Sequence, residues 1–163
     1  MKLYEPFQFL TTEQHRSIID YVKQQQPVLG TTQGPSTVRN NRVVWYRDSQ
    51  YWDHWIDEFN NIEPVIDWIQ TPQISYYRPG ESYGWHRDQD SSKRTHERYF
   101  TLTCELQSAD GGYLEIEDCQ QNSLAQGEAI VFHSERLHRA VTPTQGERIS
   151  LTIWAMAKNY HKN

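Results

Sequence analysis

Three side chains have the types and the spacing of a metal site. His86 and Asp88 lie two positions apart in a run that favours a β-strand, and side chains alternate across a strand, so both should point to one side. His138 follows fifty positions later and could supply a third ligand from another strand. Two histidines and one carboxylate leave coordination positions open on a metal, which is typical of non-haem Fe(II) oxygenases, whereas structural zinc sites use four protein ligands.

An arginine follows this set at a place where it could bind an acid. Arg148 lies ten positions after His138, and the strands that carry them would be neighbours if a tight turn at 143–146 joins them. A guanidinium binds a carboxylate through two parallel hydrogen bonds. Alternation predicts two faces on this strand, a polar one that suits a cosubstrate pocket and an aliphatic one that suits packing against helices. The polar face carries Arg148, Ser150, Thr152 and Trp154, and the aliphatic face Ile149, Leu151 and Ile153.

Helices are expected early in the chain, at 11–26 and 49–60. Thr11 and Gln14 have the spacing of a capping box at the start of the first helix. Apolar residues recur at helical spacing in both segments: Ile18, Ile19 and Val22 in the first, and Trp52, Trp55, Ile56 and Phe59 in the second. A strand is expected at 38–46. The helices should cover a core.

The second half of the chain has the character of an antiparallel β structure. Short runs of β-branched and aromatic residues alternate with glycine-containing turns and predict strands near 72–77, 83–88, 98–106, 112–116, 129–133, 138–142 and 147–156. The acidic residues across 105–118 are expected on a solvated face. This order predicts an α+β fold, a jelly roll of two sheets with the N-terminal helices on one outer face. We expect one domain over 1–163, with a helical cover at about 1–70 and the jelly roll at about 71–157.

Composition narrows the class of protein. A chain of 163 residues has the usual size of one domain, and its net charge of −5 argues against a general nucleic-acid binder. The two cysteines, Cys104 and Cys119, lack the CxxC spacing of a zinc or redox site and are expected to be reduced thiols. The N-terminal run is broken by polar residues, and no segment approaches the ~18 apolar residues of a membrane span. We therefore expect a cytoplasmic protein without a membrane segment.

The motifs together resemble a known family. The pattern YxxGxxxxxHxD from Tyr77 to Asp88, the pair Gly111–Gly112, a second histidine and an arginine ten positions on are similar to the 2-oxoglutarate and Fe(II) dependent dioxygenases, prolyl 4-hydroxylase-like group. The resemblance covers about residues 74–156. It implies a double-stranded β-helix, a cupin-like jelly roll, with Fe(II) as cofactor and 2-oxoglutarate and O2 as cosubstrates. The residues implied are His86, Asp88 and His138 as iron ligands, Arg148 on the distal carboxylate of 2-oxoglutarate, and Tyr77 and Thr152 in its pocket.

The resemblance also implies an activity. The expected oxidoreductase hydroxylates a C–H bond and releases succinate and CO2. Asp88 favours hydroxylation, because a halogenase of this family replaces its carboxylate ligand by a small residue. The substrate is expected to be a peptidyl residue, proline first, or a small molecule such as a free amino acid. Tyr83, Trp85 and Trp154 are candidates for the substrate mouth, and 89–97 has the polarity of a flap.

Other interpretations stay open. A nucleic-acid base demethylase of the same superfamily would carry a second arginine where Trp154 stands and an asparagine in place of Ser75, and a non-catalytic cupin-like binding protein is a third possibility. The oxygen-sensing prolyl hydroxylases carry a tyrosine where Glu105 stands. His133 is a rival third ligand, although its distance to Arg148 fits the pattern less well. Tyr77 could be an ordinary strand tyrosine and Trp154 a core residue.

Overall fold

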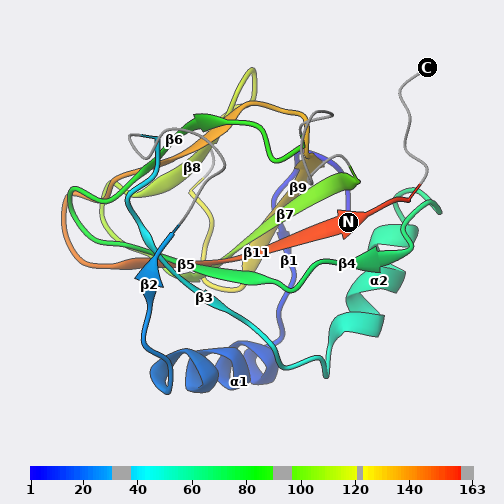
Figure 1. Cartoon of the computed structure of the whole chain (residues 1–163), viewed down its shortest axis with the longest axis horizontal. Helices are drawn as coiled ribbons and strands as arrows, with labels where there is room; N and C mark the ends of the chain where they lie inside the picture. Colours follow the sequence, from blue (N-terminus) through cyan, green and yellow to red (C-terminus); the bar gives the residue numbers. More distant parts are fainter. Residues whose placement is uncertain (31–37, 90–96, 121–122, 159–163) are drawn as a thin grey trace.

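A computed structural model describes residues 1–30, 38–89, 97–120 and 123–158 (Figure 1). The proposed flap at 89–97 lies, except for its two end residues, outside the described residues. The elements in chain order are β1 (Phe7–Gln8), α1 (Thr12–Lys23), β2 (Val28–Leu29), β3 (Arg42–Trp45), α2 (Trp52–Asn60), β4 (Trp68–Ile69), β5 (Gln73–Tyr77), β6 (Tyr83–His86), β7 (Arg98–Gln107), β8 (Tyr113–Ile116), β9 (Glu128–His133), β10 (His138–Val141) and β11 (Arg148–Met156).

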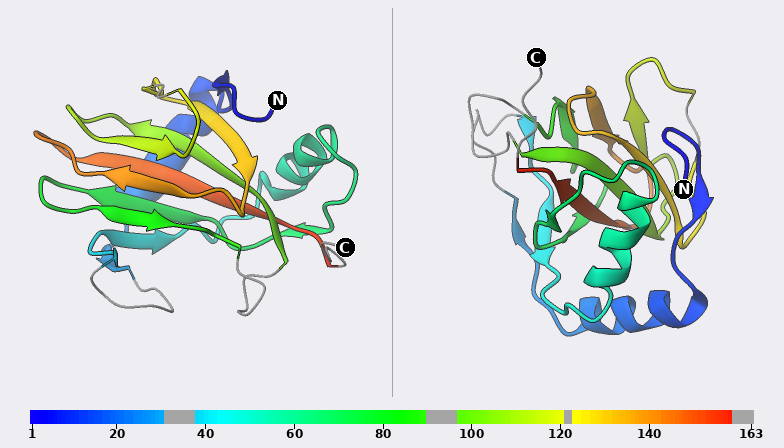
Figure 2. Two further views of the ribbon diagram at one scale, coloured as in Figure 1. Left: turned by 90° about the horizontal axis from the view of Figure 1, so that it is seen from above. Right: turned by 90° about the vertical axis from the view of Figure 1, so that its right-hand side faces the viewer.

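Two antiparallel sheets form the body of the protein. The larger sheet has the order β1-β9-β7-β11-β5-β3-β2, with β4 paired to β11, and the smaller sheet has the order β6-β10-β8. In Figure 1 the smaller sheet lies above the larger one, and α1 and α2 lie on the opposite side. The views in Figure 2 show the same arrangement from above and from the side. This is the predicted double-stranded β-helix of an α+β chain, with its N-terminal helices packed on one sheet.

The core lies between the helices and the larger sheet. The capping box of α1 is present, because the Thr11 hydroxyl accepts from the Gln14 amide and the Gln14 side chain accepts from the Thr11 amide. One buried cluster joins the apolar faces of both helices to the sheet, and it contains Ile18, Val22, Trp55, Phe59, Ile74, Phe100, Leu102, Ile149, Leu151 and Ile153. The aliphatic face predicted for β11 is therefore confirmed, and its polar face points toward the smaller sheet.

The structure corrects two predictions about strands and adds three short strands. The strand expected at 83–88 ends at His86, because the amides of Asp88 and Gln89 both donate to the carbonyl of Ser134, at 2.9 Å each, and leave the ladder. The strands that carry His138 and Arg148 are not neighbours: β10 pairs with β6 and β8, whereas β11 pairs with β5, β7 and β4. The short strands β1, β2 and β4 were not expected.

The Gly111–Gly112 pair explains how the connection before β8 reaches its place. Gly111 has a φ of +74°, and a Cβ there would lie 2.9 Å from the Thr144 side chain. A Cβ on Gly112 would lie 3.0 Å from Pro143. The first position thus requires glycine and the second leaves little room for a side chain, which lets this connection pack against the turn that carries the chain from β10 to β11. Among the described residues, no helix is long and apolar enough to span a membrane.

Candidate metal centre

His86, Asp88 and His138 come together between the two sheets. One ligand atom from each lies within 4.8 Å of the others. His86 and His138 are direct partners in the β6–β10 register, which places their rings side by side. Asp88 is positioned by the backbone contact to Ser134, with its Oδ1 3.3 Å from His86 Nε2 and its Oδ2 3.4 Å from His138 Nε2. The predicted trio therefore meets, although Asp88 reaches it from a bend and not from a strand.

Both imidazoles are oriented for ligation through Nε2. His86 Nδ1 lies 2.7 Å from the carbonyl of Gly84, and His138 Nδ1 lies 2.9 Å from the carbonyl of Arg136. A carbonyl oxygen can only accept, so each Nδ1 carries the proton and each neutral ring keeps its Nε2 lone pair for a cation. Backbone carbonyls thus select the tautomer that a metal ligand needs.

The carboxylate of Asp88 is held on one of its two oxygens. Its Oδ2 accepts a hydrogen bond from Thr101 Oγ1 and another from the indole Nε1 of Trp154, both at 2.8 Å. The Thr101 hydroxyl lies 2.9 Å from that of Ser134. These two donors leave Oδ1 available to a metal. Such outer contacts fix the direction of a ligand and contribute to metal affinity.

The electrostatics of the trio favour a positive charge at its centre. Burial alone would raise the pKa of Asp88, but the two histidines outweigh burial and hold that pKa well below its usual range. Burial lowers the pKa of His86, whereas the nearby Asp88 carboxylate more than offsets the effect of burial on His138 and raises its pKa. A buried ionised carboxylate needs a cationic partner. Two neutral imidazoles and one carboxylate on one side of a cation fit the donor set of Fe(II).

A buried ion pair lies on the larger sheet beside this centre. Arg148 and Glu105 are 1% and 3% exposed, and Arg148 Nε lies 3.0 Å from Glu105 Oε1 and donates to Oε2 at 3.1 Å. The ring of Tyr77 lies next to the guanidinium, 5.6 Å from its central carbon. Arg148 Nη2 and Glu105 Oε1 are both buried without a hydrogen-bond partner among the described groups. The expectation that the acidic residues of 105–118 are solvated is wrong for Glu105, because this strand turns its side chain inward.

The remaining pocket candidate lies on the same face. Thr152 pairs with Gln73 of β5 and with Thr103 of β7, and by alternation it shares its side of β11 with Arg148. The arginine, Tyr77 and Thr152 are thus brought to one surface, which faces the smaller sheet. An unpaired guanidinium nitrogen buried on a polar surface fits the carboxylate of an acidic ligand.

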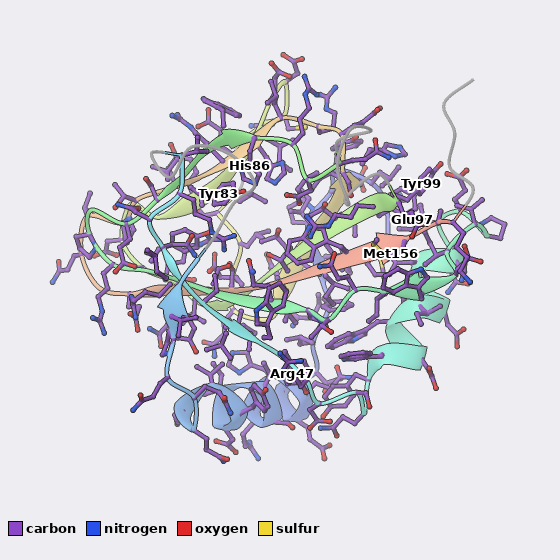
Figure 3. The ribbon with its side chains drawn as sticks, viewed as in Figure 1. Arg47, Tyr83, His86, Glu97, Tyr99 and Met156 are labelled. Carbon is purple, nitrogen blue, oxygen red and sulfur yellow. The ribbon has the colours of Figure 1, made fainter. Side chains whose placement is uncertain are left out.

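The three candidates for the substrate mouth lie in different places. Tyr83 contacts His86, with ring centroids 3.5 Å apart, and both are labelled side by side in Figure 3. Trp154 is buried outside the apolar core cluster and donates to Asp88, which places its indole beside the three candidate ligands. Trp85 is 44% exposed and lies against Arg139, next to His138 on β10, on the outer face of the smaller sheet. The structure does not bring Trp85 to the centre.

His133, the rival ligand, lies on the other face of its strand. Its ring packs against Tyr99 and Phe100, at centroid distances of 5.6 and 5.1 Å. The preceding residue, Phe132, contacts the ring of His138 at 4.8 Å. Because neighbours on a strand point in opposite directions, His133 is turned away from the trio.

Sequence reasoning did not find the residues that support the ligands. Thr101 and Ser134 hold the Asp88 carboxylate and backbone, and Arg98 stacks on Trp154 with its guanidinium carbon 3.9 Å from the ring. One signal was available for Thr101. The run from 98 to 107 places polar Thr101, Thr103 and Glu105 at every second position between buried apolar residues, which is unusual for a strand with both faces covered.

About half of the chain is similar in sequence to curated hydroxylases. A PKHD-type hydroxylase from Teredinibacter turnerae is 33% identical over 96 residues, which are 53% of this chain and 42% of that protein. A PKHD-type hydroxylase from Shewanella oneidensis is 32% identical over 92 residues, 51% of this chain and 41% of that protein. The chain thus spans less than half the length of these curated relatives.

Solved structures match the fold over nearly the whole chain. A viral collagen prolyl hydroxylase from Paramecium Bursaria Chlorella virus-1 has a TM-score of 0.73 at 20% identity, covering 94% of this chain and 95% of that one. A Pseudomonas putida prolyl-4-hydroxylase has a TM-score of 0.72 at 19% identity, covering 95% and 92%. The family model described as the 2OG-Fe(II) oxygenase superfamily matches residues 72–156, just over half of the sequence. The chain therefore belongs to the 2OG-Fe(II) oxygenase superfamily.

Proposed function

We propose that this protein is a hydroxylase that uses Fe(II), 2-oxoglutarate and O2, with His86, Asp88 and His138 as the iron ligands. The observation that carries the proposal is the paired orientation of the two imidazoles. Each Nδ1 is bound to a backbone carbonyl, so both Nε2 lone pairs point at the place where the Asp88 carboxylate also points. A structural role for these histidines would not require both rings to present the same free nitrogen.

The roles of the side chains follow from their contacts. The three ligands would hold Fe(II) and leave its remaining positions to 2-oxoglutarate and O2. Bound Fe(II) supplies the activation of O2 that oxidises 2-oxoglutarate to succinate and CO2 and places the second oxygen atom on the substrate. Arg148 would bind the distal carboxylate of 2-oxoglutarate through its buried Nη2, with Tyr77 and Thr152 beside it. Trp154 and Thr101 keep the Asp88 carboxylate in one direction.

The substrate class is a second part of the proposal. We infer a peptidyl residue, proline first, or a small molecule. The names of the relatives support hydroxylation, and the names of the structural neighbours support proline. Tyr83 beside His86 and Trp45 beside Trp154, with ring centroids 6.4 Å apart, offer aromatic surfaces near the ligands.

The ligand assignment is tested by the visible charge-transfer band that 2-oxoglutarate forms when it chelates Fe(II) without oxygen. The wild-type protein should show the band. His138→Ala should abolish it, because one ligand is lost, and His133→Ala should keep it, because that ring lies on the other face of β9. The two variants remove the same side chain from strands that follow one another in the chain, so His133→Ala is the matched control. The reverse result would exchange the two assignments.

Turnover is tested separately. Admitting O2 to the loaded protein with proline-containing peptides, or with free amino acids, should yield succinate in amounts that match hydroxylated product. Succinate without any hydroxylated peptide or amino acid would keep the oxygenase and refute this substrate class. Binding of Fe(II) and 2-oxoglutarate without succinate formation would favour the non-catalytic binding protein.

A further inference from the structure

The ion pair between Arg148 and Glu105 conflicts with the role proposed for the arginine. Both side chains are buried, and Glu105 already occupies the Nε side of the guanidinium at 3.0–3.1 Å. Together they carry no net charge. A carboxylate of 2-oxoglutarate that joins them would leave one uncompensated negative charge in a buried site. When two carboxylates lie close together in a buried site, each disfavours the charged form of the other and the pKa of one of them is raised.

The conflict is removed if one of the two carboxylates gains a proton. Glu105 is the better candidate, because burial raises the pKa of its carboxyl even though Arg148 pulls the pKa the other way. The oxygen Oε1 has no hydrogen-bond partner among the described groups. A protonated carboxyl has an O–H donor, whereas a carboxylate can only accept. A neutral Glu105 can therefore donate a hydrogen bond to the incoming carboxylate, which an ionised Glu105 would repel.

We propose that Glu105, where it is ionised in the free protein, takes up a proton from solvent as the distal carboxylate of 2-oxoglutarate binds at Arg148, and then donates a hydrogen bond to that carboxylate. The proposal rests on the proposed function, since it requires Arg148 to be the anchor. The net charge of the buried groups at this position is then zero before and after binding. Glu105 becomes the residue that links cosubstrate affinity to pH.

Few other titratable groups face this position. Arg148 on β11 is the charged group in contact with the Glu105 carboxyl. Tyr77 on β5 lies over the guanidinium, and burial raises the pKa of its phenol, so it stays neutral. Cys104, the next residue on β7, points to the other face, and burial raises the pKa of its thiol. Ala129 of β9 pairs with Cys104, and the residue before it, Glu128, is half-buried and its carboxylate accepts a hydrogen bond from the Ala125 amide.

The sign of the pH dependence follows from linkage. Below the pKa of Glu105 in the free protein the group is already protonated, so binding takes up no proton. Above it, each binding event must take up about one proton, and the affinity for 2-oxoglutarate falls by up to about tenfold per pH unit. The fall ends at the higher pKa of the complex. Higher pH therefore weakens cosubstrate binding.

Calorimetry of 2-oxoglutarate binding to the Mn(II)-loaded protein measures the proton directly. The binding enthalpy is compared in buffers of different ionisation enthalpy at each pH from 6 to 8, and no turnover is needed. We expect the wild type to take up about one proton per 2-oxoglutarate in part of this range. Glu105→Gln, which keeps the shape and loses the charge, should take up none and should bind more tightly at high pH. Pyruvate, a 2-oxo acid without a distal carboxylate, should bind without uptake to both.

A matched control is available on the outer face of the smaller sheet. Glu115 forms an ion pair with Arg139 at 2.6 Å, and Glu115→Gln should keep the wild-type proton uptake. If 2-oxoglutarate binds measurably but takes up no proton anywhere between pH 6 and 8, or if the uptake persists in Glu105→Gln, the role of Glu105 alone is overturned. If neither 2-oxo acid binds to the metal-loaded protein, the proposed function fails, and the inference fails with it.

Discussion

Removing the hydroxyl of Thr101 tests how strongly the outer contacts hold the metal centre. Thr101→Val keeps the shape of the side chain and deletes the hydrogen bond of 2.8 Å to Asp88 Oδ2. Trp154 Nε1 still donates to the same oxygen at 2.8 Å, so the carboxylate keeps one of its two donors. The substitution therefore loosens the ligand without removing it.

The expected magnitude can be bounded from these contacts. A hydrogen bond to a charged group contributes about 1.5–3 kcal/mol. The bond is present with and without metal, because the pKa of Asp88 is held low by the two histidines, so only part of that energy appears in metal affinity. Changes to outer contacts of this kind cost roughly 10–100-fold in affinity. We expect about tenfold weaker Fe(II) binding in Thr101→Val, and about 100-fold in the double variant with Trp154→Phe.

Anaerobic competition with a chromophoric Fe(II) chelator measures this affinity. Thr103→Val is the matched control, because Thr103 lies two positions further along the same face of β7 and pairs with Thr152 instead of reaching Asp88. It should bind Fe(II) as the wild type does. Equal affinity in Thr101→Val and wild type, or an equal loss in both variants, would refute the reasoning that the Thr101 hydroxyl orients the carboxylate.

Two further predictions concern the rest of the fold. Thr11→Ala removes the hydroxyl of the capping box at α1 and should lower the free energy of unfolding by about 1 kcal/mol and the Tm by roughly 2–4 °C. The control Thr12→Ala, one position inside the helix, should change the Tm much less. Thermal unfolding followed by circular dichroism measures both. Burial, with the nearby Glu105 charge, raises the pKa of the Cys104 thiol. A thiol reagent at pH 8 should therefore modify Cys119 in the native protein and Cys104 only after unfolding. Fast modification of both thiols in the native protein would contradict the buried position of Cys104.

Local patterns predicted much of the fold. The alternation along β11 correctly separated the core residues Ile149, Leu151 and Ile153 from the polar set of Arg148, because both of its faces are covered and a strand has a period of two. The capping box and the helical stripes were equally local signals. The ligand trio meets as spacing and resemblance indicated.

Contacts between distant segments were harder to predict. Asp88 was expected to reach the site by strand alternation, but its position depends on the Ser134 carbonyl, and nothing in the run from 83 to 88 signals that contact. Glu105 appeared to belong to a solvated acidic stretch because its partner, Arg148, is far away in the chain. Trp154 was ambiguous for the same reason, since the acceptor of its indole N–H lies on another segment.

The two-sided character of β11 has a consequence for how such a protein can diverge. The residues proposed to contact 2-oxoglutarate and the residues that form the core occupy alternating positions on one strand, so a substitution at one position can alter the polar face while the hydrophobic packing is unchanged. A gain or loss of one residue inside this strand would swap the two sets at once. Substitutions in this strand are therefore tolerated far more readily than insertions or deletions.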